Sequence, residues 1–497
     1  MTVPYFITSL KPHREKRSDG RPLLECLRGL TFIQWAQFFS GWMAWTCDAV
    51  DFFSVSLSVT NLERQFDKTA HDITTAITLT LLFRSLGAIV FGVVSDRFGR
   101  KWPLVINLLI IASLEIGVSF VQTFHQFLAL RAMFGVAMGG IWGLAAATAL
   151  ENLPVEIRGL ASGVVQQGYA AGYLIAAVIN LTLVPKVSVR WRAMFWCAAV
   201  FSSSAALLRA LLPESAVFLR AKEIQREQGV TTGNKTKVFL TETKQMLAKH
   251  WLLCVYAVVL MTGFNFLSHG SQDLYPTYLQ TSKNISNHNA TIATIIGNCG
   301  AITGGAIAGW VSQYLGRRLT IVIFVCTVGA FIPIWILPNS FSGLAAGAFC
   351  MQFGVQGAWG VIPIHLAEMS PPAFRATFPG VAYQLGNMIS SASAQIETIG
   401  GAHFKTYITE KGKQVQVPDY AKVQGILIGT VAAFVVFITI IGPENHAAQF
   451  EKAKTAFEEG GGNDELEIDE FPSRDKLSDD DDYEKASIQH ISRAYRV

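Results

Sequence analysis

Twelve blocks of apolar residues, each about 20 residues long, constrain what this chain can fold into more than any other feature. About 20 residues of α-helix cross the hydrocarbon core of a bilayer. Only 15% of the 497 residues are charged, against about 25% in soluble domains. The pattern predicts a membrane protein and excludes a soluble enzyme. The blocks are residues 31–60, 73–95, 102–121, 126–149, 159–184, 191–212, 251–279, 290–314, 319–337, 341–366, 376–399 and 421–442.

A long polar segment divides the blocks into two sets of six. Lysine and arginine are concentrated in the loops that lie inside if the N-terminus is cytoplasmic, so the positive-inside rule predicts both termini in the cytoplasm. The start of the chain lacks the short apolar core of a cleavable signal peptide, so the first block is expected to stay in the membrane. The predicted parts are a cytoplasmic N-terminal segment (1–30), a six-helix half (31–212), a cytoplasmic central loop (213–250), a second six-helix half (251–442) and an acidic, disordered cytoplasmic tail (443–497).

An internal repeat relates the two halves. The segment Gly92-Val-Val-Ser-Asp96-Arg97-Phe-Gly99-Arg100-Lys101 returns 217 residues later as Gly309-Trp-Val-Ser-Gln313-Tyr314-Leu-Gly316-Arg317-Arg318. The same offset carries Glu151, Pro154 and Arg158 onto Glu368, Pro371 and Arg375. One offset shared by separate motifs predicts two six-helix halves in parallel orientation, with a binding cavity between them near the bilayer midplane.

These motifs resemble the signatures of the major facilitator superfamily. They are the loop after the second block, its weaker copy after the eighth, and Arg131-x-x-x-Gly135-x-x-x-Gly139-Gly140 in the fourth. The resemblance implies an all-α membrane protein with twelve transmembrane helices in two six-helix pseudo-repeats, the major facilitator fold. It also implies transport by alternating access of the two halves.

Ionisable residues inside the blocks are few and are the first candidates for function. Placing a charge at the centre of a span costs about 2.5–3.5 kcal/mol on insertion scales, so each one needs a reason to be there. The candidates taken from them are Asp48, Asp51, Arg84, Glu115, Arg131, His269 and Asp273.

The seventh block carries a polar stripe. Asn265, His269, Asp273 and Thr277 recur every fourth residue and share one face of the helix. A histidine and a carboxylate one turn apart can hold or pass a proton. Pro276 adds a bending point and frees the backbone carbonyl near Gln272. The alternative is a structural hydrogen-bond ladder between helices.

The same stretch closely resembles the signature of the Jen family of fungal carboxylate:proton symporters, in the branch of the superfamily that includes sialate:proton symporters. The signature is N-x-x-S/T-H-x-S/T-Q-D-x-x-x-T, and its positions are filled by Asn265, Ser268, His269, Ser271, Gln272, Asp273 and Thr277. The resemblance implies proton-coupled uptake of short-chain carboxylates across the plasma membrane. It also implies substrate-binding or translocation roles for the matched Asn, His, Gln and Asp.

An anionic substrate agrees with the residues of the other blocks. Arg84, near the middle of the second block, can grip a carboxylate through two hydrogen bonds; alternatively it pairs with Asp48 or Asp51 for structure. Gln166, Gln167 and Gln384 offer amide donors, with helix-to-helix bonding as the alternative. The 217-residue offset relates Gln167 to Gln384, which could therefore approach a central ligand from opposite halves. The paired glutamines favour dicarboxylates such as succinate or malate over lactate and pyruvate.

Another set of residues is expected to control conformation or carry protons. Asp48 and Asp51 map by the repeat onto Asn265 and Ser268, so they face the same cavity, as a second proton site or as the counter-charge of Arg84. Arg131 is expected either to take part in substrate or proton coupling or to pair with Glu115 or a helix end for structure. The gating loop contains Gly92, Asp96, Arg97, Gly99 and Arg100; its glycines allow a tight turn, Asp96 is expected to cap a helix of the other half, and Arg97 and Arg100 to pair across the cytoplasmic face. Topology-setting charge alone is the alternative.

The sequence therefore predicts a symporter for short-chain carboxylates, with the proton as coupling ion, no cofactor and no nucleic-acid partner. A sugar-acid or sugar transporter of the same fold and a non-transporting nutrient receptor are the open alternatives. An enzyme is not expected, because no nucleotide loop, nucleophile elbow or metal-ligand cluster is present. In the tail, Ser478-Asp-Asp-Asp-Asp-Tyr resembles an acidophilic kinase site, and its lysines are candidates for ubiquitylation and endocytosis, against a simply solvated tail.

Overall fold

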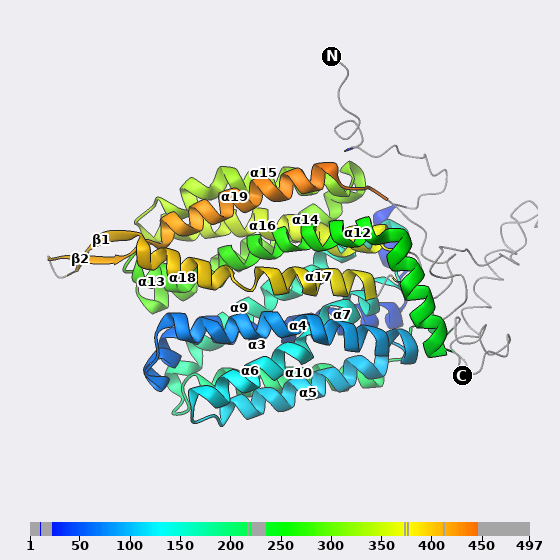
Figure 1. The fold of residues 1–497 in the computed structure, drawn as a ribbon, viewed down its shortest axis with the longest axis horizontal. Coiled ribbons are helices and arrows are strands. Elements are labelled where there is room, and N and C mark those ends of the chain that lie inside the picture. The colour runs from blue at the N-terminus through cyan, green and yellow to red at the C-terminus, as the bar shows by residue number, and fades with distance from the viewer. Residues whose placement is uncertain are drawn as a thin grey trace, which may run out of the picture.

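The computed structural model is a single helical body with its helices side by side (Figure 1). It describes residues 10, 22–215, 218–219, 235–371, 374, 377–410 and 413–445; for a few of these, Asp96 among them, only the backbone is described. The acidic tail beyond residue 445, with its kinase-like motif, and Arg375 of the repeat lie outside the described residues.

Six spans, preceded by the short helix α2 (Leu23–Arg28), form the N-terminal half. Two of them are broken near the middle of the membrane, where α6 passes into α7 at Gly140 and α8 passes into α9 at Gln167. The spans are α3 (Phe32–Phe66), α4 (Ala70–Phe98), α5 (Lys101–Ser119), α6 (Phe124–Gly139) with α7 (Ile141–Leu150), α8 (Arg158–Gln166) with α9 (Gly168–Thr182), and α10 (Arg192–Leu211); the 3-10 turns Val155–Ile157 and Val184–Lys186 flank the fifth.

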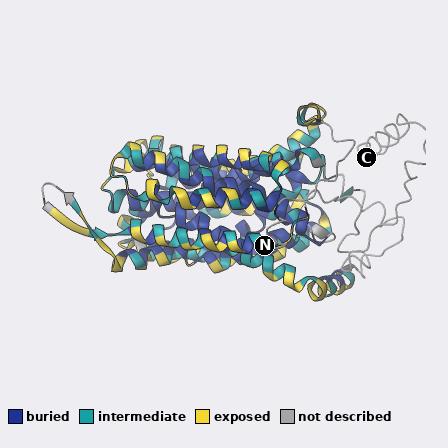
Figure 2. Cartoon of the chain, turned by 90° about the horizontal axis from the view of Figure 1, so that it is seen from above, coloured by how far each residue is buried: buried dark blue, intermediate teal, exposed yellow. Residues whose placement is uncertain are grey.

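Six further spans form the C-terminal half, and two of these are also broken. The spans are α12 (Lys235–Gln272) with α13 (Tyr275–Thr281), α14 (Asn287–Leu315), α15 (Arg317–Ile336), α16 (Phe341–Met369), α17 (Thr377–Ser390) with α18 (Ser393–His403), and α19 (Tyr420–Ile441). The twelve-helix fold predicted from the apolar blocks is confirmed. Large apolar side chains such as Leu211, Leu252 and Phe437 are exposed on its outside, as a lipid-facing surface requires, whereas buried residues fill the inside (Figure 2).

Nine segments of the described chain are long and apolar enough to cross a membrane by length and composition alone. The other three spans are α3, α16 and the α17–α18 pair. Helices α3 and α16 bury most of their central residues in protein, while α17 and α18 are each shorter than a full span. Polar residues are tolerated in these spans because protein, not lipid, surrounds them.

Three loops differ from the sequence expectation. Residues 235–249 of the predicted central loop form the first part of helix α12, which is kinked at His250 (φ −114°, ψ 22°). The loop before the last span forms an antiparallel hairpin of β1 (Lys405–Glu410) and β2 (Lys413–Pro418), so the chain is not helical throughout. The hairpin projects from the end of the body opposite to this kink (Figure 1). Glu444, placed with the tail, packs instead against the start of α15.

The 217-residue repeat is realised in detail at the end of the body away from the hairpin. Gly99 and Gly316 have nearly equal positive φ angles, 95° and 93°, a backbone conformation that glycine adopts without strain. Arg100 pairs with Glu151 at 3.1 Å. Its counterpart Arg317 makes two bonds of 2.9 Å to Glu368. The two halves therefore tie the start of their third helix to the end of their fourth in the same way.

Removing the carboxylate of the second pair is expected to destabilise the protein more than removing that of the first. Arg317 and Glu368 are each 3% exposed, so Glu368→Gln leaves a buried guanidinium without its counter-charge, at a cost of about 3 kcal/mol. Arg100 and Glu151 are 14% and 20% exposed, and Glu151→Gln should cost about 1 kcal/mol or less. Thermal unfolding of the purified variants measures this difference, and equal destabilisation would contradict it.

Candidate functional site

The polar stripe of the seventh span is buried in the centre of the molecule. Asn265, Ser268, His269, Ser271 and Gln272 on α12, and Asp273 directly after it, are each at most 4% exposed. The helix breaks just after them, at Asp273–Leu274, before Pro276 in the first turn of α13. As predicted, this break frees the Gln272 carbonyl, which accepts a 3.4 Å hydrogen bond from the Tyr173 hydroxyl of the other half.

His269 and Asp273 form a direct pair. The Nδ1 atom of His269 lies 3.0 Å from Oδ2 of Asp273, and its Nε2 atom lies 3.0 Å from Oδ1 of Asn387 on α17. Asn387 donates to Oε1 of Gln384 at 2.8 Å, and Gln384 donates in turn to the carbonyl oxygen of Gly139 in the N-terminal half at 3.4 Å. A chain of hydrogen bonds therefore runs from the His269–Asp273 pair to the opposite half.

The polarity of this chain decides where the histidine carries hydrogen. The Gly139 carbonyl can only accept, so each amide in the chain points its NH₂ group toward Gly139 and its oxygen toward His269. Oδ1 of Asn387 then requires a hydrogen on Nε2 of His269. With Nε2 protonated, a hydrogen bond between Nδ1 and Asp273 exists only if one more proton lies between them. This arrangement of donors and acceptors can hold one proton between His269 and Asp273.

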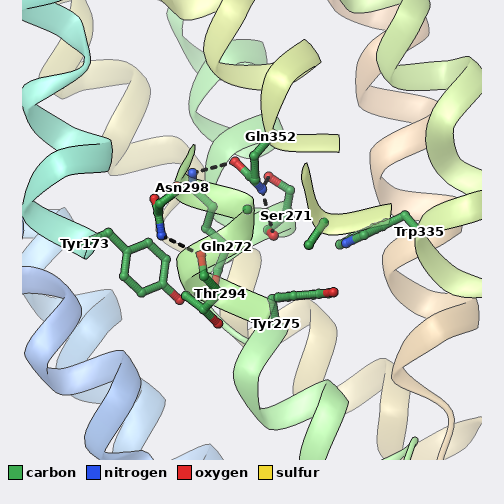
Figure 3. A pocket seen from close by; sticks show the side chains of 10 residues that line it. Tyr173, Ser271, Gln272, Tyr275, Thr294, Asn298, Trp335 and Gln352 are labelled. Atoms are coloured by element: carbon green, nitrogen blue, oxygen red, sulfur yellow. Dashed lines mark hydrogen bonds between the residues drawn. The ribbon is translucent and has the colours of Figure 1, made fainter. Parts of the chain in front are cut away.

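A second network links α12 to α16. Ser268 donates to Oε1 of Gln272 at 3.1 Å, and Gln272 donates to Oε1 of Gln352 at 2.7 Å. The amide of Gln352 donates to the Ser271 hydroxyl oxygen, and the amide of Gln356 donates to the Ser268 hydroxyl oxygen. Beside it is a small pocket whose lining includes Ser271, Gln272, Gln352, Asn298 on α14 and Tyr173 on α9 (Figure 3). Both halves therefore contribute to a polar pocket on one side of the seventh span.

Arg84 is fully buried on α4 and is held loosely. Its Nη2 atom lies 3.5 Å from Oδ2 of Asp48, and its guanidinium carbon lies 5.6 Å from the centre of the Tyr383 ring. Its Nε and Nη1 atoms have no acceptor among the described residues. Buried donors of this kind are costly unless a ligand or water satisfies them. Arg84 thus combines the predicted Asp48 contact with two donors that remain open.

Arg131 makes a different pair from the one considered in the sequence. Its Nη1 atom is 2.6 Å from Oδ2 of Asp51, and it lies over the Phe134 ring at 4.3 Å. Glu115, the partner considered for it, instead accepts a hydrogen bond from Ser202 on α10. Arg84 with Asp48 and Arg131 with Asp51 thus form two ion pairs inside the N-terminal half. Among the described contacts, neither aspartate reaches the seventh-span residues to which the repeat relates it.

The predicted symmetry mates Gln167 and Gln384 do approach each other's half. The amide of Gln167 donates to the carbonyl oxygen of Gln356 at 3.2 Å. Gln384 donates to the carbonyl of Gly139, and residues 139 and 356 are themselves separated by 217 positions. Gln166, by contrast, accepts from the Trp142 indole within its own half at 3.0 Å. In the closed conformation two equivalent glutamine bonds cross between the halves.

Contacts between the halves close the site at both ends. Toward the hairpin end, Thr78 on α4 donates to the carbonyl of Ser391, and Gln395 donates to Thr74. Toward the opposite end, Gln313 donates to the carbonyl of Glu156. The polar residues between these ends are buried, so this conformation is occluded.

The contacts described for the gating loop lie mainly within its own half. Arg100 contacts Glu151, and the backbone N–H groups of Arg100 and Lys101 donate to Glu214. Arg97 lies over Phe98, and the side chain of Asp96, expected to cap a helix of the other half, lies outside the described residues. Glu214 therefore accepts hydrogen bonds from the backbone at the start of α5. A Cβ atom at Gly92 would lie 3.7 Å from Thr377 of the other half.

Gly309, the repeat mate of Gly92, lies in a close contact between the halves. A Cβ atom there would be 2.7 Å from the carbonyl oxygen of Gly159 and 2.8 Å from Cα of Gly163, closer than two packed atoms approach. Gly309→Ala is expected to push the cytoplasmic ends of the halves apart and lower the transport rate at least tenfold. The readout combines uptake with thiol labelling of a cysteine introduced beside Gly163, which should become faster.

Gly329→Ala is the matched control, because nothing lies within 4 Å of that position. It should leave both uptake and labelling as in the parent chain. Unchanged labelling and uptake in Gly309→Ala would contradict the close contact.

Two six-helix halves around a buried polar site define a membrane carrier of the alternating-access class. The pattern of the Major Facilitator Superfamily matches residues 31–394. The chain is 35% identical to the carboxylic acid transporter protein homolog of Saccharomyces cerevisiae over 451 residues, 88% of this chain and 73% of that protein. It belongs to the Major Facilitator Superfamily and, within it, to the family of this yeast protein, so the family resemblance of the seventh span is confirmed.

More distant relatives share the same body. The cis,cis-muconate transport protein of Acinetobacter baylyi is 25% identical over 363 residues, 73% of this chain and 86% of that one. The partially occluded, inward-open xylose transporter XylE of E. coli has a TM-score of 0.63 at 17% identity, covering 83% of this chain and 99% of XylE. At that identity the likeness to XylE concerns the fold alone.

Several residues of the site were not singled out from the sequence. Gln352 and Gln356 are one turn apart in an apolar block, and Asn387 follows Gln384 by three residues, so helical spacing from a known polar residue could have found them. Tyr383 contacts Trp142 and Trp359, with ring centres 4.7 and 5.6 Å apart. Aromatic residues are so common in this chain that no pattern distinguished Tyr383.

Proposed function

We propose that this chain imports short-chain carboxylates together with protons across the plasma membrane, with both termini in the cytoplasm. The observation that carries the proposal is Arg84, a buried guanidinium with two open donors in the half opposite the proton-holding His269–Asp273 pair. The names of the relatives support the substrate class: one is a carboxylic acid transporter homolog, and another transports muconate, a dicarboxylate. Enzymatic chemistry has no part in the proposal.

The proposed cycle begins with both groups accessible from outside. A proton enters the His269–Asp273 pair, and the substrate carboxylate displaces Asp48 from Arg84 and takes up its open donors. With the charges of substrate and Asp273 neutralised, the halves close and the glutamine bonds between them form. Opening at the cytoplasmic end then releases substrate and proton. Each half supplies one binding element, so only the loaded carrier gains the full set of contacts.

The preferred substrates under this proposal are dicarboxylates such as succinate or malate, with lactate and pyruvate as the smaller alternatives. A second carboxylate needs donors beyond Arg84. The amides of Gln272 and Gln352 line the pocket beside the seventh span. There Gln272 donates to Gln352, and Gln352 donates to the carbonyl oxygen of Ser271. Neutral amide donors of this kind suit a carboxylate without adding another buried charge.

Uptake of labelled succinate and lactate tests the proposal, in a yeast without its own carboxylate permeases that expresses this chain. External pH is recorded at the same time. Uptake accompanied by external alkalinisation and abolished by a protonophore is the expected result. A chain that reaches the cell surface but takes up neither acid would overturn the proposal and favour a sugar-acid substrate or a receptor.

A further inference from the structure

A buried carboxylate in the eleventh span has no role in the mechanism described so far. Glu397 on α18 is completely buried, and so is Gln424, its neighbour on α19. The amide nitrogen of Gln424 donates to Oε2 of Glu397 at 2.7 Å. Among the described residues no cation pairs with Glu397, whereas Asp48, Asp51 and Asp273 each contact an arginine or a histidine.

Two oxygen atoms of the Glu397–Gln424 pair lack a hydrogen-bond donor among the described residues. Oε1 of Glu397 and Oε1 of Gln424 both lack a hydrogen-bond partner among the described residues, and both are acceptors. A single proton on Oε1 of Glu397 turns that atom into a donor beside the amide oxygen of Gln424. The acid and the amide then form a mutually bonded pair, and a buried, unpaired charge is avoided.

We propose that Glu397, with Gln424 as its hydrogen-bond partner, is a second proton-binding site, which supplies the His269–Asp273 pair from the outer side of the membrane. This inference rests on the proposed function, because it assigns the route by which the coupling proton arrives.

The position of Glu397 matches this role. Helix α18 leads into the β1–β2 hairpin, at the end of the body away from the cytoplasmic kink (Figure 1). Ser393 lies one helical turn before Glu397 and faces α12, since a Cβ atom on Gly270 would lie 3.5 Å from its hydroxyl oxygen. The Ser393 hydroxyl interacts with Glu397, and Oδ1 of Asp273 lacks a hydrogen-bond partner among the described residues. Polar atoms thus continue from Glu397 through Ser393 toward Asp273.

Transfer along this line conserves one proton. The O–H bond of Glu397 breaks as its proton passes to the Ser393 oxygen, while the hydroxyl proton of Ser393 forms a new O–H bond with Oδ1 of Asp273. Glu397 becomes a carboxylate and is reprotonated from the outer side. No oxidant, reductant or other reactant takes part.

The titratable groups around Glu397 are compatible with this step. Helix α12 contributes Asp273 and His269, and α19 contributes Tyr420, which interacts electrostatically with Glu397. Gln395 on α18 donates to the carbonyl of His71 and to the hydroxyl of Thr74. His71 and Asp72 lie in the first turn of α4. His403, at the end of α18, bonds to its own helix backbone. Asp273 is close enough to Glu397 to interact with it electrostatically.

Infrared spectroscopy of the full-length protein in lipid tests the site itself. At neutral pH the parent chain should show a carboxylic-acid C=O band that Glu397→Gln lacks. Glutamine at this position still accepts from Gln424 and donates to it, so the fold should be preserved. Glu25→Gln, at an exposed position of α2, is the matched control and should leave the band intact. A band that persists unchanged in Glu397→Gln would overturn the proposal.

Transport assays test the route. Glu397→Gln should lower proton-driven accumulation at least tenfold, while exchange of labelled for unlabelled substrate continues at a rate within about twofold of the parent chain. Unchanged accumulation with an unchanged pH profile would overturn the route. If the parent chain transports no carboxylate yet its infrared band disappears in Glu397→Gln, the proposed function fails and the proton site stands.

Discussion

Replacing Asp273 with asparagine is expected to abolish the accumulation of substrate against its gradient. Asparagine can still bond to Nδ1 of His269 and keep the geometry of the pair, but it cannot hold the proton that the polarity of the Asn387–Gln384–Gly139 chain places there. The expected accumulation ratio falls to the equilibrium value, a loss of tenfold or more. Exchange of substrate at equal concentrations on both sides should continue, because this process needs no net proton movement.

Asp67→Asn is the matched control for this variant. Asp67 is exposed and ends α3 with φ 51°, a conformation that asparagine adopts readily. It should accumulate substrate like the parent chain. The decisive measurement follows labelled succinate and external pH together in Asp273→Asn. Accumulation that still collapses with a protonophore would remove Asp273 from the coupling mechanism.

Replacing Arg84 with lysine is expected to raise the KM for carboxylate at least tenfold. Lysine keeps the charge but loses the planar pair of donors that grips a carboxylate through two bonds. A hydrogen bond to a charged group contributes about 1.5–3 kcal/mol, and each 1.4 kcal/mol corresponds to a factor of ten in affinity. Arg64→Lys, at an exposed position of α3, is the control and should leave the KM unchanged.

A second comparison separates substrate binding from structural pairing at Arg84. If Arg84 served only to neutralise Asp48, the double variant Arg84→Gln with Asp48→Asn would restore transport, because no unpaired charge would remain. If Arg84 binds substrate, the double variant stays as inactive as Arg84→Gln alone. Initial uptake rates over a range of succinate concentrations distinguish the two results, and restoration would contradict the substrate role.

The fold was largely predictable because its determinants are local or repetitive. Apolar blocks of spanning length marked the helices, and a single offset of 217 residues related Gly99 to Gly316 and Arg100 to Arg317 before any contact was known. The hairpin after α18 was not predicted, because only a loop is expected between two membrane spans, although the residues of this segment alternate in polarity around Gly412. The helix before His250 was hidden in a charged segment that looked like a loop.

The candidate site was predictable in its composition but not in its pairings. The spacing of the seventh span placed His269 and Asp273 on one face, and their contact depends only on helix geometry. The partner of Arg131 could not be chosen from the sequence, because Asp51 and Glu115 lie on different helices whose packing decides the distance. Glu397 was missed for a related reason: it stands near the end of an apolar block, where a carboxylate could equally have reached water.

Sequence by itself determined the membrane class, the two related halves, the family, and the polar stripe of the seventh span. Each of these follows from composition or from spacing along one helix. Only the tertiary structure decided that a chain of hydrogen bonds runs from His269 through Asn387 and Gln384 to Gly139. It alone also decided that two nitrogen atoms of Arg84 lack an acceptor among the described residues and that Glu397 accepts a hydrogen bond from Gln424. These are contacts between helices far apart in the chain, and only the packing of the helices brings their side chains within hydrogen-bond distance.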